Sequence, residues 1–469
     1  MNWELFGISL YILSMLFVGV WVSKRIKTED DYFLGGRTLG PFLATFSIFA
    51  TWFGAETCIG TAGNVYNSGL SNLHADPLGY TICLFIMALF FAKVLWRKKI
   101  TTIPDLFRER FSPNVEKLSA ILMIPGSIIW AAAQIRALGQ IIHANSDIGV
   151  TFAVTAAATV VVAYTMLGGL LADAYNDLIQ GIAVIIGLVF LFGAVIIDQG
   201  GIAPFLAAIP VDKLTFSGGQ GESLGFLGNL ELWMVPILGS LMAQELVSRV
   251  VASRSEKVAF NSSLRAASIY FMVGCIPVFI GLLGPQYFPN LKDSETLMPL
   301  LAKTHLNFVF YIIFIGALVS AILSTVDTTL LSASALSSHN LIYPLFPNLT
   351  EKQKMRVARG GTFVAGIVAY LIAFASESIT GLVETASSLG GPSILIITLI
   401  ALWVKQGNSK NAIFAITMSI VTWFITTFII VIEYSVILTV TMCAISYFIS
   451  LPFTKSSTQS LAIGPFNES

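Results

Sequence analysis

The chain has 469 residues and carries 26 basic and 26 acidic side chains, so its formal net charge is zero. Hydrophobic residues make up 55% of it and charged residues only 11%, whereas an ordinary soluble domain is about 25% charged. This composition excludes a soluble protein and gives no reason to expect a nucleic-acid partner. It predicts an integral membrane protein that is surrounded by the lipid bilayer.

Long apolar segments recur along the chain, and each is close to the roughly 20 residues that a helix needs to cross a bilayer. We predict an all-α protein with a single membrane domain over residues 1–469 and thirteen membrane spans. These spans are expected near residues 4–23, 41–66, 76–96, 117–144, 148–167, 171–198, 230–251, 262–285, 307–336, 357–375, 378–404, 411–430 and 432–452. The first segment has no basic stretch before its apolar part, so we interpret it as a retained span and not as a signal peptide.

The basic residues are distributed unevenly between the two sides of these spans. If the N-terminus lies outside, 22 of the 26 Lys and Arg residues, Arg249 among them, fall in inner loops or at inner helix ends. Three fall in outer loops, and Arg136 lies within a span. Because cytoplasmic loops carry the excess of Lys and Arg, we expect the N-terminus outside and the C-terminus inside. The expected location is the plasma membrane, in a bacterium the inner membrane.

Two spans are interrupted by glycine, proline and acidic residues. The second span reads FSIFATWFGAETCIGTAG and predicts a break near 50–57, and the seventh reads MVPILGSLMAQELVSRV and predicts a break near 238–246. An unwound membrane helix frees carbonyls and amides that an ion or a substrate can satisfy, and matched breaks in two halves are typical of inverted-repeat transporters. The alternative for either break is that glycine only permits close helix packing.

The two breaks are about 190 residues apart, and the same offset separates the fourth span from the ninth. This indicates that five spans are repeated as five more. We therefore predict a 5+5 inverted repeat. The expected order is a leading extra helix, the first repeat, the second repeat, two trailing helices and a short cytoplasmic tail, over residues 4–23, 41–198, 230–404, 411–452 and 453–469.

The ninth span carries an acid in apolar surroundings. Asp327 at that depth costs about 2.5–3.5 kcal/mol on insertion scales, which indicates a functional role. Ser324 and Thr328 share its helix face, because residues three and four apart lie above one another. In the sixth span Asp173 and Asp177 are four residues apart and form a candidate counter-face. Oxygen ligands of this kind favour a hard cation.

An interpretation without an ion also remains open. The hydroxyl groups could bond to carbonyls of their own helix while Asp327 pairs with Arg136 or is protonated. The four cysteines lie inside predicted spans without CxxC spacing, and the four histidines form no cluster with carboxylates. The sequence therefore predicts no enzymatic activity.

Three stretches together resemble the sodium/solute symporter family, and the resemblance extends over nearly the whole chain. They are DYFLGGR at 31–37, AYTMLGGLLADAYNDLIQ at 163–180, and AILST at 321–325, which matches the motif A-x-x-S-[ST]. The resemblance implies a leucine-transporter-like core and sodium-coupled symport by alternating access.

The resemblance also implies a set of ion ligands. The family's shared sodium site would use the carbonyls of two residues at the first break and three residues of the ninth span: Ala50, Phe53, Ala321, Ser324 and Thr325. Some members hold a second sodium nearer the inside, which here would use Asp177, Asp327 and Thr328. Asn176 stands where the family usually has threonine, which weakens this second site. The expected cofactor is one sodium ion, with two ions as the alternative.

Within the family the chain is most similar to the high-affinity choline transporters, in ATW at 50–52, GYTICLFIMALFFAK at 79–93, WAAA at 130–133 and STVDTTLLSASAL at 324–336. Those transporters surround a quaternary ammonium group with aromatic faces. Trp52 and Trp130 match two positions of that cage, and the third position is Ala243, so one aromatic wall is missing. Glu56 and Glu245 stand near the two breaks and could supply negative charge instead.

The predicted substrate-binding residues are therefore Trp52, Glu56, Thr57, Trp130, Ala243, Gln244 and Glu245. Arg136 lies about two helical turns outward of Trp130. We expect it at a gate or in the outer vestibule, where it could bind a substrate carboxylate or pair with Glu56.

These observations predict a sodium-coupled symporter that imports a small organic cation or zwitterion such as choline, betaine or an amino acid. Two alternatives remain open. One is a proton-coupled permease of the same fold, and the other is a sodium symporter for a sugar, sialic acid or a small carboxylate. The expected partners are the small-molecule substrate and the lipid bilayer, and no obligate protein partner is expected.

Overall fold

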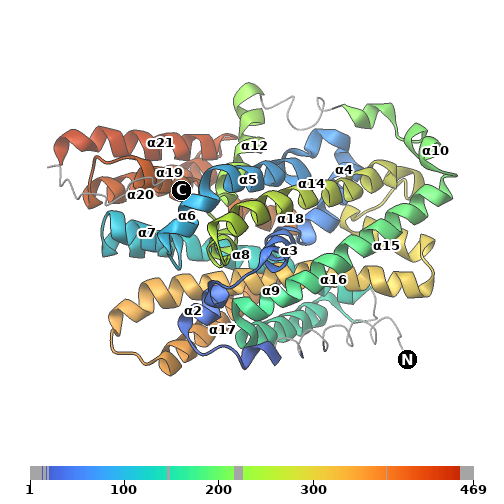
Figure 1. The fold of residues 1–469 in the computed structure, drawn as a ribbon. Helices are drawn as coiled ribbons and strands as arrows, with labels where there is room; N and C mark the ends of the chain where they lie inside the picture. Colours follow the sequence, from blue (N-terminus) through green and yellow to red (C-terminus); the bar gives the residue numbers. More distant parts are fainter. Residues whose placement is uncertain are drawn as a thin grey trace.

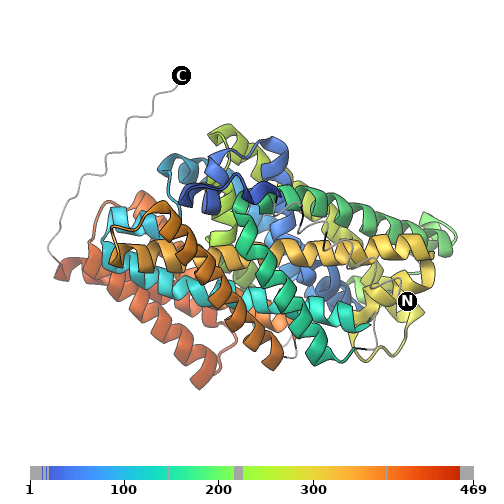
Figure 2. The same ribbon diagram turned by 90° about the horizontal axis from the view of Figure 1, so that it is seen from below.

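The computed structural model describes residues 13, 17, 21–144, 148–215, 225–376 and 378–454. These residues are predominantly helical, with one isolated β-bridge between Leu39 and Ser253. The helices form one bundle, and the two last long helices, α20 (Ser409–Phe424) and α21 (Ser435–Ser450), lie side by side at its edge (Figures 1 and 2).

Further helical elements of the first half are α2 (Glu29–Leu34), α3 (Pro41–Trp52), η2 (Glu56–Gly60), α4 (Thr61–Ser68), η4 (His74–Gly79), α5 (Tyr80–Ile86), α6 (Ala92–Lys98), α7 (Ile103–Arg110), α8 (Pro113–Ala144), α9 (Val150–Asp198) and α10 (Ile202–Ala207). Those of the second half are α12 (Gly225–Ser240), α13 (Gln244–Val251), α14 (Glu256–Tyr287), α15 (Leu297–His305), α16 (Phe308–Ser337), η8 (Ser338–Ile342), α17 (Glu351–Ala375), α18 (Ile379–Ser388) and α19 (Gly391–Trp403).

Within the described residues, nine helices are long and apolar enough to cross a membrane, and two bent helix pairs raise the number to 11. The nine are His74–Lys98, Pro113–His143, Gly168–Asp198, Glu256–Tyr287, Phe308–Leu345, Glu351–Ala375, Ile379–Trp403, Ser409–Ile429 and Ser435–Phe453. Each of them corresponds to a predicted span. The predicted span 148–167 corresponds to a shorter apolar helix, Val150–Ala163, and most of the predicted span 4–23 lies outside the described residues.

The first bent pair begins with α3 and changes direction by 58° before η2. Pro41 occupies the first position of α3, where its missing N–H costs nothing. The helix ends at Trp52, and Phe53 leaves the helical conformation with φ −87° and ψ 70°. A Cβ atom at Gly54 would lie only 2.5 Å from the Glu56 carboxylate, so a side chain at position 54 would require Glu56 to move. The predicted break near 50–57 is thus at residues 53–55.

The second bent pair, α12 and α13, changes direction by 46°. Ala243 precedes α13 in an extended conformation, inside the break predicted near 238–246. A Cβ atom at Gly239 would lie 2.2 Å from the Ser387 carbonyl oxygen, and one at Gly391 would lie 2.0 Å from the Gly239 carbonyl oxygen. Helix α12 therefore meets the turn between α18 and α19 backbone against backbone.

Helix α16 lies in the interior, where it packs against α8, α9 and α17. Its side chains from Ala317 to Leu336 are all buried. Helix α9 packs along α16 and is kinked at Gly169, whose positive φ of 56° suits glycine. In Figure 1, α3 lies near the middle of the bundle, and it contacts both α9 and α16. The two spans with the predicted ion ligands are thus neighbours.

Candidate functional site

The end of α3 touches the hydroxyl-rich part of α16 directly. The Thr325 hydroxyl donates a hydrogen bond to the Thr51 carbonyl oxygen at 3.0 Å and to the Ala321 carbonyl oxygen at 3.2 Å. One turn further along, the hydroxyl oxygens of Thr51 and Thr328 are 3.4 Å apart. All four residues are buried. Residues 50–53 and 321–325, which sequence reasoning grouped into one ion site, therefore lie against each other.

Backbone carbonyls are concentrated at the end of α3. Phe53 N–H donates to the Phe49 carbonyl oxygen, which closes the last turn of the helix. The carbonyls of Ala50 and of the residues after it lie beyond that last bond. Carbonyl groups at the end of a helix accept no hydrogen bond from the helix itself and can bind other partners. Thr325 supplies one partner, on Thr51. The predicted ligand carbonyls of Ala50 and Phe53 flank that residue in the chain and belong to buried residues.

The predicted inner ion site has a cationic side chain in it. Asp177 accepts hydrogen bonds from Ser47, at 2.5 Å, and from Ser324. The Arg249 guanidinium donates to Asp173 and to the Thr328 hydroxyl, and it lies 3.5 Å from the Asp177 carboxylate. The Arg249 side chain is only 1% exposed. Sequence reasoning had counted it as a cation at an inner helix end, but it is buried inside the bundle.

Asp327 lies beside this network and, like Ser324, bonds to a residue of α9. Its carboxylate accepts a hydrogen bond from the Thr165 hydroxyl of α9 at 2.5 Å. Arg136, the alternative partner considered from the sequence, lines a separate cavity. That cavity has a volume of about 480 Å³ and is also lined by His143, Asp293, Glu295 and Lys303. The placement of Arg136 at a gate or in the outer vestibule stays a prediction.

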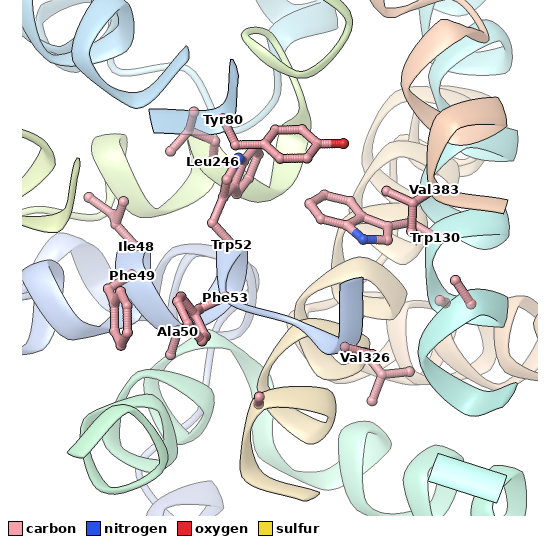
Figure 3. Packing of buried hydrophobic residues seen from close by; sticks show 14 of the residues in the cluster. Ile48, Phe49, Ala50, Trp52, Phe53, Tyr80, Trp130, Leu246, Val326 and Val383 are labelled. Carbon is pink, nitrogen blue, oxygen red and sulfur yellow. The ribbon is translucent and has the colours of Figure 1, made fainter. Parts of the chain in front are cut away.

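Two tryptophans and a tyrosine gather on one side of the α3 break (Figure 3). The Trp52 and Trp130 rings are perpendicular, with centroids 5.1 Å apart. The hydroxyl groups of Tyr80, on α5, and Ser387, on α18, are 3.4 Å apart. The predicted pair of tryptophans is thus in contact, and Tyr80 is an aromatic neighbour that sequence reasoning missed.

A small cavity of about 50 Å³ lies between α8, the second break and the turn after α18. It is lined by Trp130, Ala243, Gln244, Glu245 and Ser387, among others. Glu245 is 2% exposed, and its Oε1 atom has no hydrogen-bond partner. A buried carboxylate oxygen without a partner is costly, so this cavity has a built-in preference for a group that donates hydrogen bonds or carries positive charge.

The other predicted substrate residues have defined partners. Thr57 lies 2.9 Å from the Tyr270 hydroxyl and donates to Asp76 at 3.2 Å. Gln244 accepts from Ile103 N–H at 3.0 Å and donates to the Thr101 carbonyl oxygen at 3.1 Å. The amide of Gln244 therefore anchors the second break to the segment before α7.

Glu56 is held by two donors from α8. It accepts from Trp130 Nε1 at 3.1 Å and from Gln134 Nε2 at 2.7 Å. Trp130 and Gln134 thus fix the Glu56 carboxylate next to the break. Neither of these two donors is Arg136, the partner of Glu56 considered from the sequence.

Comparison with known proteins identifies the family. The sodium:solute symporter family profile matches residues 32–419. The chain belongs to the sodium:solute symporter family. This symporter is 28% identical to the human high affinity choline transporter 1 over 441 residues, which cover 87% of the chain and 74% of the relative. It is 26% identical to the sodium/proline symporter of Escherichia coli K12, over 88% of the chain and 86% of the relative.

The fold of the symporter is also found among solved structures. A Na+-coupled sialic acid symporter, solved in a substrate-bound outward-open state, superposes with a TM-score of 0.84 at 21% identity and covers 98% of this chain and 99% of that one. The nucleobase-cation symporter Mhp1 superposes with a TM-score of 0.58. The protein is therefore a sodium-coupled membrane transporter that imports a small organic solute, and it is not an enzyme.

Proposed function

We propose that this symporter imports a small organic cation or zwitterion, of the type of choline, betaine or an amino acid, by alternating access. The observation that carries the proposal is the unpaired oxygen of the buried Glu245 carboxylate in a cavity walled by Trp130. An ammonium group would meet both a negative charge and an aromatic face there. The human choline transporter and the bacterial proline symporter among the relatives support the same chemical class.

The cavity must enlarge to admit such a solute. Its volume of about 50 Å³ is well below the roughly 300–1,000 Å³ of ordinary ligand pockets. Trp130 lines this cavity, and Trp52, which is not among the lining residues, packs against the Trp130 ring. We therefore assign to these two rings the role of walls that separate when solute enters.

We assign one sodium ion to the site formed by the Ala50 and Phe53 carbonyls with Ala321, Ser324 and Thr325. Its support is the direct contact of Thr325 with the carbonyl-rich end of α3. A second ion at Asp177, Asp327 and Thr328 has less support. The Arg249 guanidinium already supplies positive charge between Asp173 and Asp177, and Asp327 is bound to Thr165.

Sodium at this site would hold the end of α3 against α16 and so favour the state that receives solute from outside. The coupling is reciprocal, because each ligand can shift the equilibrium only by its difference in affinity for the two states. The membrane potential adds about 2.3 kcal/mol per charge for each 100 mV. Inward movement of sodium would thereby drive import of the solute.

The proposed topology has thirteen spans in a 5+5 inverted repeat, with the N-terminus outside and the C-terminus in the cytoplasm. Its support is the pair of bent helices at corresponding positions of the two halves. The excess of basic residues on one side supports the orientation. We place the protein in the plasma membrane, without an obligate protein partner.

Uptake into proteoliposomes tests the proposal. Radiolabelled choline, betaine and proline should accumulate under an inward sodium gradient and not when potassium replaces sodium. Accumulation that persists in potassium and follows a pH gradient would overturn sodium coupling in favour of a proton-coupled permease. A thermal-shift screen of the purified protein in sodium tests which solutes bind. Stabilisation only by sugars, sialic acid or small carboxylates would overturn the organic-cation assignment.

A further inference from the structure

Glu56 is a buried acid that directly follows the break in the first bent helix pair. It is the first residue of η2 and is only 5% exposed. The sequence placed it among the substrate-binding residues, but its two hydrogen-bond donors lie on α8. Trp130 Nε1 donates to Oε1, and Gln134 Nε2 donates to Oε2.

The direction of these hydrogen bonds follows from their neighbours. The Oε1 atom of Gln134 accepts from the Ala55 N–H at 3.1 Å, so the amide is oriented with its NH₂ group toward Glu56. The indole N–H of Trp130 can only donate. Both carboxylate oxygens of Glu56 thus accept a hydrogen bond from α8.

Glu56 also lies close to the proposed sodium site. A Cβ atom built on Gly54 would be 2.5 Å from Glu56 Oε2 and 2.9 Å from the Thr325 hydroxyl oxygen. The two oxygens therefore both lie within 2.9 Å of a single point. The groups assigned to sodium at Ala50, Phe53, Ala321, Ser324 and Thr325 are all neutral, being carbonyls and hydroxyls. Glu56 is an acid that lies next to the Thr325 end of this set, as Asp177 lies next to Ser324.

The other buried acids near the centre have different surroundings. Asp177 also lies beside the proposed sodium site, where it accepts a hydrogen bond from Ser324. Asp177 and Asp173 interact with Arg249, and Asp76 accepts from Tyr270 and Thr57. Glu245 faces the solute cavity. Of the acids described here, Glu56 is the one that touches the wall of that cavity through Trp130 and also approaches Thr325.

We propose that Glu56 couples the two sites: it supplies the negative charge that favours sodium beside Thr325, and its hydrogen bond to Trp130 sets the position of the indole that walls the solute cavity. This inference rests on the proposed sodium site. A sodium ion that attracts the Glu56 carboxylate would change the hydrogen bond between Glu56 and Trp130. A solute that moves Trp130 would in turn shift the Glu56 carboxylate relative to the sodium site. By linkage, sodium changes the affinity for solute by the same factor by which solute changes the affinity for sodium.

The test measures sodium binding to the purified protein by calorimetry, in potassium buffer, for wild type and variants. Glu56→Gln keeps the shape of the side chain but removes its charge, and it should raise the sodium Kd at least tenfold. Glu231→Gln is the matched control, because Glu231 is also a buried carboxylate that accepts two strong hydrogen bonds, from Val436 and Ile437 N–H on α21. Its sodium Kd should remain within twofold of wild type.

A second variant separates charge from coupling. Trp130→Phe keeps the carboxylate but removes the indole N–H. It should keep sodium affinity within threefold, while the ratio of choline Kd in potassium to choline Kd in sodium falls toward one. This variant also keeps the proposal testable if Glu56→Gln does not fold, which its melting temperature in potassium will show.

The outcomes distinguish this inference from the sodium-site proposal on which it rests. If Thr325→Ala weakens sodium binding and Glu56→Gln does not, the sodium site stands and the role of Glu56 is overturned. If neither variant changes the sodium Kd, the sodium site itself is wrong. If Trp130→Phe leaves the sodium dependence of choline binding unchanged, the coupling through the indole is overturned.

Discussion

Arg249 donates a hydrogen bond to Asp173 in the interior of the bundle, and their side chains are only 1% and 3% exposed. The same guanidinium also contacts Thr328 and Asp177, so one cation joins α9, α13 and α16. Removing one partner of a buried ion pair leaves the other charge without compensation, which is far more costly than losing a surface pair.

Loss of the Arg249 charge should therefore destabilise the protein strongly. We expect Arg249→Leu to cost about 3–5 kcal/mol of stability, seen as a lower melting temperature in detergent. The double variant Arg249→Leu with Asp173→Asn should recover part of this loss, because it removes a charge that would otherwise be unpaired. Equal melting temperatures for wild type and Arg249→Leu would contradict the assignment of the pair as structural.

The hydroxyl groups on α16 give a prediction for ion binding. Ser324→Ala and Thr325→Ala should each raise the sodium concentration for half-maximal uptake at least tenfold, because each removes an oxygen ligand of the proposed site. Expression should stay normal. Thr329→Val is the control, since the Thr329 hydroxyl bonds only to carbonyls of its own helix, at Thr325 and Val326. A sodium dependence that is altered equally in all three variants would indicate a packing effect.

The unpaired oxygen of Glu245 gives a prediction for the substrate. Glu245→Gln should weaken choline binding about tenfold, which corresponds to about 1.4 kcal/mol, because the cavity loses its negative charge. The sodium Kd should change little. Tighter binding of choline to the variant, or a loss confined to neutral solutes, would show that the cavity does not select positive charge. Thermal stabilisation by choline, titrated in saturating sodium, measures the effect.

Helix α7 contains an acid whose ionised form is stabilised by folding. Burial disfavours the charge of Asp105, but hydrogen bonds from His339 and from the N–H groups of Thr102 and Thr101 outweigh it, so the pKa of Asp105 lies below its ordinary value of 3.8. A lowered pKa stabilises the folded state above pH 3.8, and this contribution is lost as the pH falls through the folded value.

Replacing Asp105 with asparagine should consequently lower the melting temperature at pH 7, and the difference from wild type should shrink below about pH 4. Melting curves between pH 3 and pH 7 in a non-ionic detergent measure this. Asp30→Asn is a control, because Asp30 lies on the same side of the protein in α2 and is about half exposed. A gap between wild type and Asp105→Asn that is constant with pH would contradict a role for the charge.

The features predictable from the sequence are those with a local signature. The break after Trp52 was visible because Gly54 and Glu56 interrupt an apolar run. The face shared by Ser324 and Thr328 followed from helix periodicity. These signals depend only on residues close together in the chain.

What the sequence did not reveal depends on contacts between distant residues. Arg249 looked like a cytoplasmic cation because it stands near other basic residues, and its acid partners are on α9, more than 70 residues earlier. Asp327 was grouped with Ser324, but a helix face is wide enough for it to turn toward Thr165. Tyr80 looked like one more apolar residue in the run GYTICL, because nothing local marks its hydroxyl as a neighbour of Ser387.

The contact of Gly239 with Ser387 and Gly391 limits how this transporter can be engineered. With no side chain between the two backbones, even one added methyl group must push α12 away from the α18–α19 turn. Alanine at Gly391 would thus act as a wedge that holds the two segments apart. Gly391 itself lines the proposed solute cavity, so such a wedge offers a way to trap a single conformer for imaging while every side chain assigned to ion or solute is kept.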